Sequence, residues 1–203
     1  MARLIMIRHG ESVANLERRF TRDATEPLTP AGIEQARARG EAIRGRYAPV
    51  ALYSSPFRRA FETAEQIGIV LGLAPQVIAD LREQSFGIYH GRPYTELYGI
   101  YAAGSADRWT VKPDGGEMLR DVALRAGAAL DSIARRHLGA EVVVVSHGGV
   151  MSALRGWVAD DYTTAPTPTA NAGGYVLHWT GERYQGPFDL ESPDSAALGH
   201  LGS

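Results

Sequence analysis

The chain has 203 residues, of which 44% are hydrophobic, and a formal net charge of −2. This length and apolar content suit one compact domain with a buried core, and the near-neutral charge argues against a nucleic-acid-binding protein. No cysteine is present, which excludes disulfides, thiolate metal sites and cysteine-based catalysis. Among the 21 basic residues only Lys112 is not arginine, which we interpret mainly as charge on solvent-facing helix surfaces.

The N-terminal residues predict a buried strand, and neither a signal peptide nor a membrane span. Their apolar run covers only residues 4–7 and is interrupted at once by Arg8. A continuous apolar run of this length is typical of a strand with both faces covered. We therefore predict a cytoplasmic protein without a membrane partner. A polar, turn-rich stretch follows over residues 11–26.

The first helix is predicted to begin at Pro30 and to end at about Tyr47. Thr29 is a suitable N-cap, and proline is favoured in the first turn because its missing N–H would have no partner there. The expected buried face has helical spacing and consists of Ile33, Ala36, Gly40, Ile43 and Tyr47.

The next elements repeat this alternation of strand and helix. Residues 50–53 predict a second buried strand, and Pro56 is placed to open the helix that follows it. That helix is expected to end at Leu71, because Gly72 favours a C-terminal cap. A short strand is predicted over residues 75–78.

The second half of the chain contains the clearest strand. Residues 84–116 are predicted to be irregular, and a long helix is predicted over residues 117–138, with Gly139 as its C-terminal cap. Four consecutive valines over residues 142–145 resist helix and favour a pleated strand, which ends at Ser146.

Alternating strands and helices with short connections predict an α/β fold. The crossover helices must cover the sheet, so we expect a three-layer α/β/α sandwich with a mostly parallel central sheet. No linker divides the chain, and we predict a single domain over residues 1–191. The small and polar tail, residues 192–203, is expected to be flexible.

Polar side chains gather where the predicted strands end. In open α/β sheets the ligand crevice lies outside the carboxyl ends of the strands. Strict alternation would place Arg8 and His9 on opposite faces, so both reach one pocket only if the strand has already broken, which Gly10 permits. The segments at these ends are Arg8-His9-Gly10, Ser54-Ser55-Pro56 and Ser146-His147-Gly148-Gly149.

Five ordered motifs resemble those of the histidine phosphatase family, which also contains the cofactor-dependent phosphoglycerate mutases. The resemblance covers roughly residues 3–180 and implies a phosphoglycerate mutase-like fold. The motifs are Arg8-His9-Gly10-Glu11-Ser12 with Asn15 and Asp23 to Gly32; Ser54-Ser55-Pro56 with Arg59-Ala60 and Thr63-Ala64; Leu81-Arg82-Glu83 with Phe86-Gly87 and Gly91; Gly115-Gly116-Glu117; and Ser146-His147-Gly148-Gly149.

The resemblance implies that His9 is a nucleophile that becomes transiently phosphorylated. For an isolated histidine, a hydrogen-bonded structural role at a strand end would be the default. Arg8, Arg59 and a cationic His147 would hold the phosphate oxygens and neutralise their charge. Arg58 competes with Arg59 for this role, but the family places its essential arginine directly before alanine, which selects Arg59.

The resemblance also assigns Glu83 as the proton donor to the leaving oxygen and later as the acceptor of a proton from water. We expect Glu83 to be ionised until a phosphate binds, because nearby arginines favour the carboxylate and bound phosphate favours the acid. A surface glutamate at a strand end is the alternative. Glu11 follows the nucleophile too closely to reach a leaving group and is interpreted as structural.

Three further residues are assigned to the phosphate site with open alternatives. Asn15 could donate a hydrogen bond to phosphate or be a turn residue, and Ser12 could do the same or stabilise a turn. Gly148 is placed with the phosphate-binding residues. No role is assigned to the histidines outside the motifs, although Tyr89-His90-Gly91 stands where the family more often has an aromatic, an acidic residue and glycine.

We therefore predict a phosphatase that hydrolyses a small organic phosphate monoester and needs no cofactor or metal. A phosphoglycerate mutase would use the same residues but would require extra cations before Gly115, where the chain offers only Arg92, Arg108 and Lys112. Aromatic residues are concentrated over residues 86–109 and could line a substrate wall or simply pack a core.

Two other classes of function remain as alternatives. The oligomeric state is also open between a monomer and a homodimer. A metal-dependent hydrolase could use His9, His147 and a carboxylate, but no metal-binding spacing is present and Arg8 would repel a cation. A catalytically silent binding module is the other alternative. It would be expected to lack the nucleophile, an arginine or the acid, all of which are present.

Overall fold

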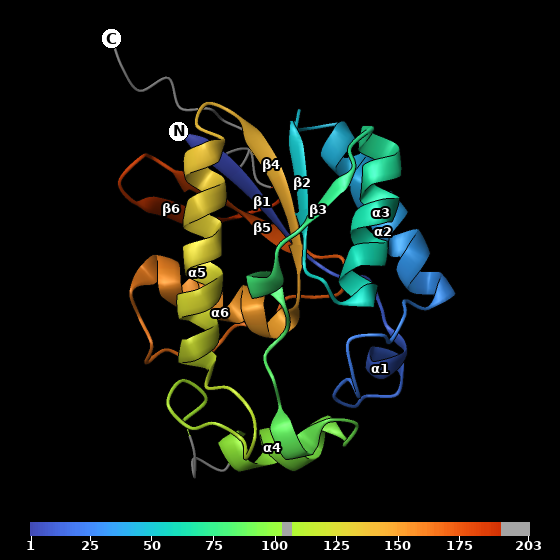
Figure 1. The fold of residues 1–203 in the computed structure, drawn as a ribbon, viewed down its shortest axis with the longest axis vertical. Coiled ribbons are helices and arrows are strands. Elements are labelled where there is room, and N and C mark those ends of the chain that lie inside the picture. Colours follow the sequence, from blue (N-terminus) through green and yellow to red (C-terminus); the bar gives the residue numbers. More distant parts are fainter. Residues whose placement is uncertain (103–106, 192–203) are drawn as a thin grey trace.

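A six-stranded sheet forms the centre of the protein (Figure 1). The computed structural model describes residues 1–102 and 107–191, so the predicted tail over residues 192–203 lies outside the described residues. The strand order across the sheet is β3-β2-β4-β1-β5-β6. The strands are β1 (Ala2–Arg8), β2 (Ala51–Ser54), β3 (Pro75–Val77), β4 (Glu141–Ser146), β5 (Gly174–Trp179) and β6 (Tyr184–Asp189).

The sheet is mixed: four strands pair in parallel, and the last two are added by antiparallel pairing. β1, β2, β3 and β4 run parallel, whereas β5 is antiparallel to β1 and β6 to β5. The parallel part follows the sequence prediction, but β5 and β6 were not predicted. Gly174 begins β5 and Pro187 lies within β6, and both residue types weaken a strand signal. Pro187 is tolerated because β6 is at the edge of the sheet.

Helices cover both faces of the sheet, which confirms the predicted α/β/α sandwich. Figure 1 shows α2 (Pro30–Arg44) and α3 (Arg58–Leu71) on one side, and α5 (Leu119–Arg136) and α6 (Gly148–Ala159) on the other. Alternate residues of β1 enter two separate cores: Leu4 and Met6 join the one beneath α5 and α6, and Ile5 and Ile7 the one beneath α2 and α3. Burial on both faces explains the continuous apolar run of β1.

The start of α2 follows the prediction, whereas its end does not. The side-chain oxygen of Thr29 accepts a hydrogen bond from the Gly32 N–H at 3.0 Å, which makes Thr29 the N-cap ahead of Pro30. The helix ends at Arg44 rather than near Tyr47. Tyr47 is nevertheless buried, because its hydroxyl donates to the Leu190 carbonyl at 2.9 Å.

Two other predicted helices begin later than expected. α3 begins at Arg58 rather than at Pro56, because the Phe57 N–H donates to the Ser55 hydroxyl in a turn before the helix. α5 begins at Leu119 and ends at Arg136, two residues inside each predicted limit. Glu117 stays outside α5 because its backbone N–H donates to the Ser85 carbonyl at 2.9 Å.

The stretch predicted to be irregular contains a helix, which is a correction to the sequence analysis. α4 (Tyr94–Ala102) lies beyond the carboxyl ends of the parallel strands, and the short α1 (Val13–Leu16) lies near the same end (Figure 1). Two 3-10 turns, η1 (Ala79–Leu81) and η2 (Gly87–Tyr89), complete this region. Tyr94, Leu97 and Tyr101 of α4 have helical spacing and pack on one side, but Ile100 is exposed, so the helix is not clearly amphipathic.

A small third core attaches α4 to the rest of the protein. Phe20, Phe86 and Leu97 are buried together, with tyrosines of the segment packed against them. The aromatic residues therefore do pack a core, which was one of the two interpretations left open by the sequence. Within the described parts of the chain, no helix has both the length and the apolar character needed to span a bilayer.

Candidate active site

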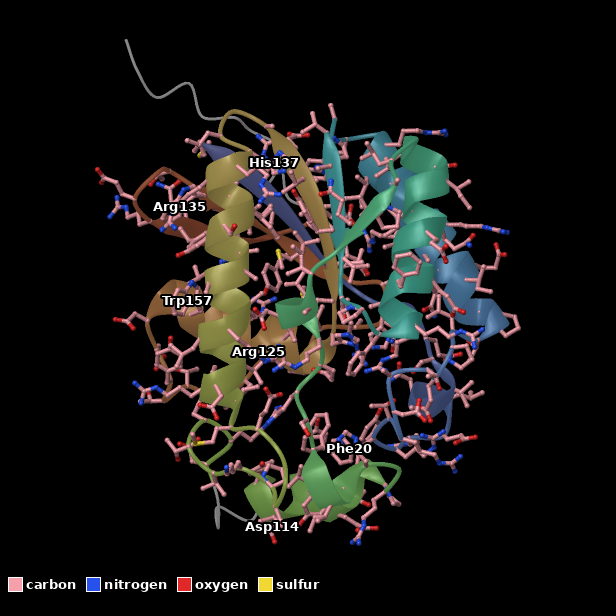
Figure 2. All side chains as sticks on the ribbon, in the orientation of Figure 1. Phe20, Asp114, Arg125, Arg135, His137 and Trp157 are labelled. Atoms are coloured by element: carbon pink, nitrogen blue, oxygen red, sulfur yellow. The ribbon has the colours of Figure 1, made fainter. Side chains whose placement is uncertain are left out.

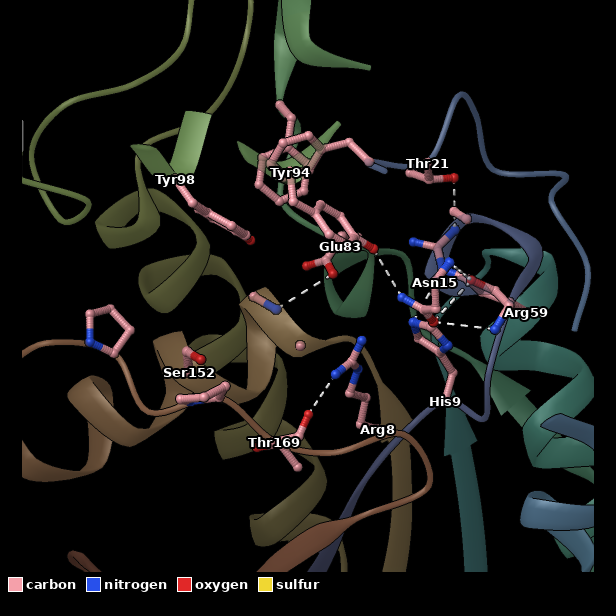
Figure 3. A pocket seen from close by; sticks show the side chains of 18 of the residues that line it. Arg8, His9, Asn15, Thr21, Arg59, Glu83, Tyr94, Tyr98, Ser152 and Thr169 are labelled. Carbon is pink, nitrogen blue, oxygen red and sulfur yellow. Dashed lines mark hydrogen bonds between the residues drawn. The ribbon is translucent and has the colours of Figure 1, made fainter. Parts of the chain in front are cut away.

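A cavity of about 380 Å³ lies between the carboxyl ends of the parallel strands and α4 (Figure 3). The ends of β1 and β4 meet there, as predicted, together with Arg59 from the first turn of α3, whereas Ser54-Ser55-Pro56 at the end of β2 is not among the lining residues. The predicted site residues that line the cavity are Arg8, His9, Ser12, Asn15, Arg59, Glu83 and Gly148.

His9 presents one unprotonated ring nitrogen. Only 2% of the residue is exposed, and its Nδ1 lies 2.7 Å from the Gly10 carbonyl oxygen. A carbonyl oxygen can only accept, so the hydrogen bond assigns the ring proton to Nδ1. Nε2 accepts a hydrogen bond from Nε of Arg59 at 3.3 Å. The imidazole is therefore the tautomer whose lone pair is on Nε2, the nitrogen available to attack an electrophile.

Close backbone packing turns the chain directly after His9. A Cβ at Gly10 would lie 2.4 Å from the Gly32 carbonyl oxygen, so only glycine allows this approach to the start of α2. The Gly10 N–H donates to the Thr63 hydroxyl at 3.1 Å. This turn breaks β1 after Arg8 and lets both Arg8 and His9 line one cavity, as the sequence analysis required.

Two guanidinium groups converge on His9 without a carboxylate partner. Arg59 is 3% exposed, and its Nη1 donates to the Thr21 hydroxyl at 3.2 Å. Nη1 of Arg8 donates to the Thr169 carbonyl at 2.6 Å, while its buried Nε has no hydrogen-bond partner among the residues that the structure describes. Within residues 1–102 and 107–191, neither arginine forms a salt bridge. Such a pair favours binding of a dianionic group such as phosphate.

Arg58, the competitor for the same role, points away from the cavity. Its Nε lies 2.7 Å from Oε1 of Glu62, and its side chain is 56% exposed. The preference for Arg59 over Arg58 therefore agrees with where the two side chains lie.

His147 lies behind His9 and does not line the cavity. The residue is fully buried, and its ring meets that of His9 edge-on, with the centroids 5.2 Å apart. Its Nε2 is 2.7 Å from the Ser55 hydroxyl. Its buried Nδ1 has no hydrogen-bond partner among the described residues, so the predicted contact of His147 with phosphate stays a prediction.

Burial keeps both histidines neutral. For His9, burial is the largest cause that lowers the pKa well below its usual 6.5, and the charges of Arg59 and Arg8 lower it further. Burial and the same two arginines also lower the pKa of His147. At neutral pH both imidazoles of the folded chain are therefore neutral, and His147 would become a cation only if a bound anion raised its pKa.

The N-terminus of α6 and Glu83 close the remaining side of the cavity. Gly148 and Gly149 line it, and a helix N-terminus favours anions through its free N–H groups. A Cβ at Gly149 would lie 2.6 Å from Oε1 of Glu83, so the glycine leaves room for the carboxylate. Figure 3 shows Glu83, Arg8 and His9 around one space.

Comparison with known proteins agrees with this geometry. A model of the histidine phosphatase superfamily, branch 1, matches residues 4–186. The chain belongs to this superfamily.

Its relatives within the superfamily include both mutase-like proteins and phosphatases. Phosphoglycerate mutase-like protein 4 of Arabidopsis thaliana is 37% identical over 75% of this chain and 69% of its own length. The metal-independent phosphoserine phosphatase of the same plant is 33% identical over 89% of this chain and 78% of its own. A mycobacterial glucosyl-3-phosphoglycerate phosphatase in complex with VO3 superposes with a TM-score of 0.81 at 28% identity, covering 92% of this chain and 98% of that one.

In this member of the histidine phosphatase superfamily, Asn15 joins several walls of the cavity. Its amide nitrogen donates to the Tyr94 hydroxyl on α4 at 3.0 Å, and its oxygen accepts from Asn171 at 2.9 Å. Ser12 donates its hydroxyl to the same oxygen at 3.0 Å and is the N-cap of α1. For Ser12, this is the turn-stabilising role that the sequence analysis left open.

Asn171 is a site residue that sequence analysis missed. Besides Asn15, its amide donates to the carbonyl oxygens of His9 and Gly10, both at 3.2 Å, and so fixes the turn at the nucleophile. Thr169, whose carbonyl oxygen accepts from Arg8, was also missed. Both lie in the connection between α6 and β5. The sequence there is rich in threonine and proline, which indicates a loop but no particular contact.

The side of the cavity away from His9 is largely aromatic. Tyr94 and Tyr98 line it together with Phe20 and Phe86. Arg108 also lines it, with its guanidinium 5.2 Å from the centre of the Tyr98 ring. The aromatic segment therefore supplies a cavity wall as well as a small core, and both interpretations of residues 86–109 apply.

No metal centre accompanies this site within the part of the chain that the structure describes. No three histidine or acidic side chains lie close enough together there to hold a metal ion.

Proposed function

We propose that this protein is a phosphatase that hydrolyses a small organic phosphate monoester through a transient phosphohistidine on His9. The observation that carries the proposal is the unprotonated Nε2 of His9, buried beside the guanidinium groups of Arg8 and Arg59, which form no salt bridge within the described part of the chain. A phosphoryl group supplies both the electrophile for Nε2 and the negative charge for the arginines.

The first step transfers the phosphoryl group to the enzyme. Nε2 of His9 forms a bond to phosphorus, the bond from phosphorus to the leaving oxygen breaks, and Glu83 donates a proton to that oxygen. Arg8 and Arg59 neutralise the phosphate oxygens as charge moves through the transition state. The Gly10 carbonyl keeps its hydrogen bond from Nδ1–H and so stabilises the positive charge that develops on the ring.

The second step returns the phosphoryl group to water. Glu83, now a carboxylate, takes a proton from the attacking water, the new oxygen bonds to phosphorus, and the bond to Nε2 breaks. Inorganic phosphate leaves, and both His9 and Glu83 regain their starting protonation states. Gly148 and the first turn of α6 would bind the phosphate during both steps.

The cavity is larger than a phosphate group alone, so it also holds an organic moiety against the aromatic wall. The relatives named for phosphoserine and glucosyl-3-phosphoglycerate make phosphorylated hydroxy acids and amino acids the first compounds to assay. We propose a substrate in this size range.

A phosphoglycerate mutase is the second candidate, because the relatives include a mutase-like protein and a 2,3-bisphosphoglycerate-dependent phosphoglycerate mutase of Gloeobacter violaceus that is 35% identical. Of the three cations that sequence analysis weighed for binding a carboxylate, only Arg108 is among the residues that line the cavity. Arg92 is half exposed and pairs with Glu96, and Lys112 is exposed. The scarcity of such cations supports the phosphatase.

The test is a panel of phosphate monoesters assayed with the wild type and with His9→Ala. The panel includes phosphoserine and 3-phosphoglycerate, the latter with and without 2,3-bisphosphoglycerate. We expect phosphate release by the wild type, its loss in His9→Ala, and acid-labile phosphate on the wild-type chain during turnover. Isomerisation of 3-phosphoglycerate faster than phosphate release would overturn the proposal.

Three further properties stay predictions. These are the single domain over residues 1–191, the cytoplasmic location, and the state as a monomer or homodimer.

A further inference from the structure

Arg125 holds the backbone of the segment that carries Glu83. It projects from α5 toward the chain between β3 and α4 (Figure 2), and its side chain is only 12% exposed. The guanidinium donates to three carbonyl oxygens of this segment: Asp80 at 2.7 Å, Arg82 at 2.9 Å and Glu83 at 3.1 Å. Hydrogen bonds from a charged donor are shorter and stronger than those between neutral groups.

Glu117 completes the arrangement from the other side. Its two carboxylate oxygens accept from Nε and Nη2 of Arg125, each at 3.0 Å, and one of them also accepts from the Ser85 N–H at 2.9 Å. Gln84 donates its side-chain amide to the Glu117 carbonyl at 2.9 Å. We call Arg125 and Glu117 together the Arg125–Glu117 clamp.

The clamp itself is ionised. Burial disfavours the charge of Glu117, but the hydrogen bonds from Arg125 and from the Ser85 backbone outweigh it and hold the pKa of Glu117 below its ordinary value. A fixed carboxylate and a fixed guanidinium therefore face the same short segment.

Besides the clamp, the segment that carries Glu83 is anchored at Leu81, whose side chain is buried in the core and whose carbonyl oxygen accepts from the Ser146 hydroxyl at 2.8 Å. The segment contains only the single turn η1 after β3. The Glu83 carboxylate accepts from the adjacent Gln84 N–H at 2.9 Å and lies 3.5 Å from the Gly149 N–H, a long contact. The place of this side chain therefore depends on where its backbone is held.

We propose that Arg125 and Glu117 are positioning residues that hold Glu83 where it can protonate the leaving oxygen. This inference rests on the proposed function. Neither residue is among those that line the cavity around His9. Their effect should therefore fall on the proton transfer rather than on phosphate binding.

Leaving-group dependence separates this role from general structural support. Phenyl phosphate and p-nitrophenyl phosphate have nearly the same shape, but the nitro group makes the phenolate stable enough to leave without a proton. Only phenyl phosphate needs a general acid. The ratio kcat/KM reports the first irreversible step, the release of the leaving group, and so isolates this proton transfer.

The experiment compares the two esters in the wild type, Arg125→Met, Glu117→Gln and Glu83→Gln. In Arg125→Met we expect kcat/KM for phenyl phosphate to fall about 10- to 100-fold, and that for p-nitrophenyl phosphate to change by less than about threefold. Glu83→Gln should show the same selective loss at least as strongly. Glu117→Gln keeps an oxygen for the Ser85 N–H but loses the ion pair, and should show the selective loss in a folded protein.

Arg135→Met is the matched control, because Arg135 lies on the same helix with its side chain 67% exposed and 3.6 Å from Asp131. We expect Arg135→Met to leave kcat/KM for both esters unchanged. Retained turnover of p-nitrophenyl phosphate demonstrates that the variants fold. Equal losses on both esters in Glu117→Gln, or no loss on either, would overturn the inference.

The same experiment distinguishes failure of the proposed function from failure of this inference. If His9→Ala hydrolysed both esters as fast as the wild type, the phosphohistidine route would be wrong and this inference with it. If His9→Ala is inactive and Glu117→Gln shows no selectivity, only the positioning role is wrong.

Discussion

At the scale of single residues, the chemistry of the site depends on hydrogen bonds that fix which ring nitrogen of His9 carries the proton. The Gly10 carbonyl assigns the ring proton of His9 to Nδ1, and Arg59 meets the other nitrogen. The types of these residues could be read from the sequence because they occur in ordered motifs. Their partners Asn171 and Thr169 could not, because only the folded chain brings the connection before β5 to the end of β1.

Replacement of Arg59 should reduce turnover far more than stability. For Arg59→Met we expect kcat/KM for p-nitrophenyl phosphate to fall about 10²- to 10³-fold, the usual cost of losing one oriented donor in a transition state. The free energy of unfolding should hold or rise, because a buried charge without a carboxylate partner is removed. Steady-state kinetics and urea unfolding measure the two effects.

Arg58→Met provides the comparison from the adjacent position of α3. Its guanidinium is exposed and bound to Glu62, so both kcat/KM and stability should stay close to the wild type. Similar losses of activity in both variants would contradict the assignment of Arg59.

At the scale of elements, the site depends on where strands stop and helices start. The start of α2 was predictable because Thr29 and Pro30 are local signals of a helix N-terminus. α6 was not predicted, because it opens with Gly148 and Gly149, which are poor helix formers. α4 was missed because packing against Phe20 and Phe86, rather than its own pattern, stabilises it.

The contact between Gly10 and α2 should be intolerant of a side chain. In Gly10→Ala the new Cβ would lie 2.4 Å from the Gly32 carbonyl oxygen, so the backbone must shift. We expect a loss of about 1–3 kcal/mol in the free energy of unfolding, the usual range for overpacking, together with reduced turnover. Urea denaturation followed by circular dichroism measures the loss.

Gly45→Ala at the other end of α2 is the matched substitution. Its Cβ would meet the nearest atom at 3.6 Å, and its φ of −73° suits alanine, so stability should hold or rise slightly. A destabilisation as large as that of Gly10→Ala would argue against close packing as the cause.

At the scale of the whole molecule, the sheet order places the nucleophile at the centre of the protein. β1 lies between β4 and β5, so His9 directly follows a strand that is covered on both faces and both edges. The parallel half of the sheet and its three layers were predictable from alternating strands and helices. The antiparallel half was not, because Gly174 and Pro187 weaken the strand pattern there.

Burial of two neutral histidines in this centre should make the protein sensitive to mild acid. The pKa values of His9 and His147 are lower in the folded chain than the usual 6.5 of an unfolded one. Below pH 6.5 the unfolded chain therefore takes up protons that the folded chain does not. Acidification should destabilise the fold by at most about 1.4 kcal/mol per pH unit for each histidine, whereas their contribution above 6.5 is constant.

Urea unfolding between about pH 5 and 8 tests this expectation. The double variant His9→Gln, His147→Gln should lose much of the decline below pH 6.5. An unchanged decline in the double variant would assign the acid sensitivity to other groups.

The hydrogen bond between His9 and the Gly10 carbonyl also fixes the regiochemistry of the phosphoenzyme. An imidazole in water can be phosphorylated on either nitrogen, but here one nitrogen is occupied by the backbone of the next residue. Every turnover must therefore pass through the same positional isomer, and the polypeptide chain itself enforces that choice.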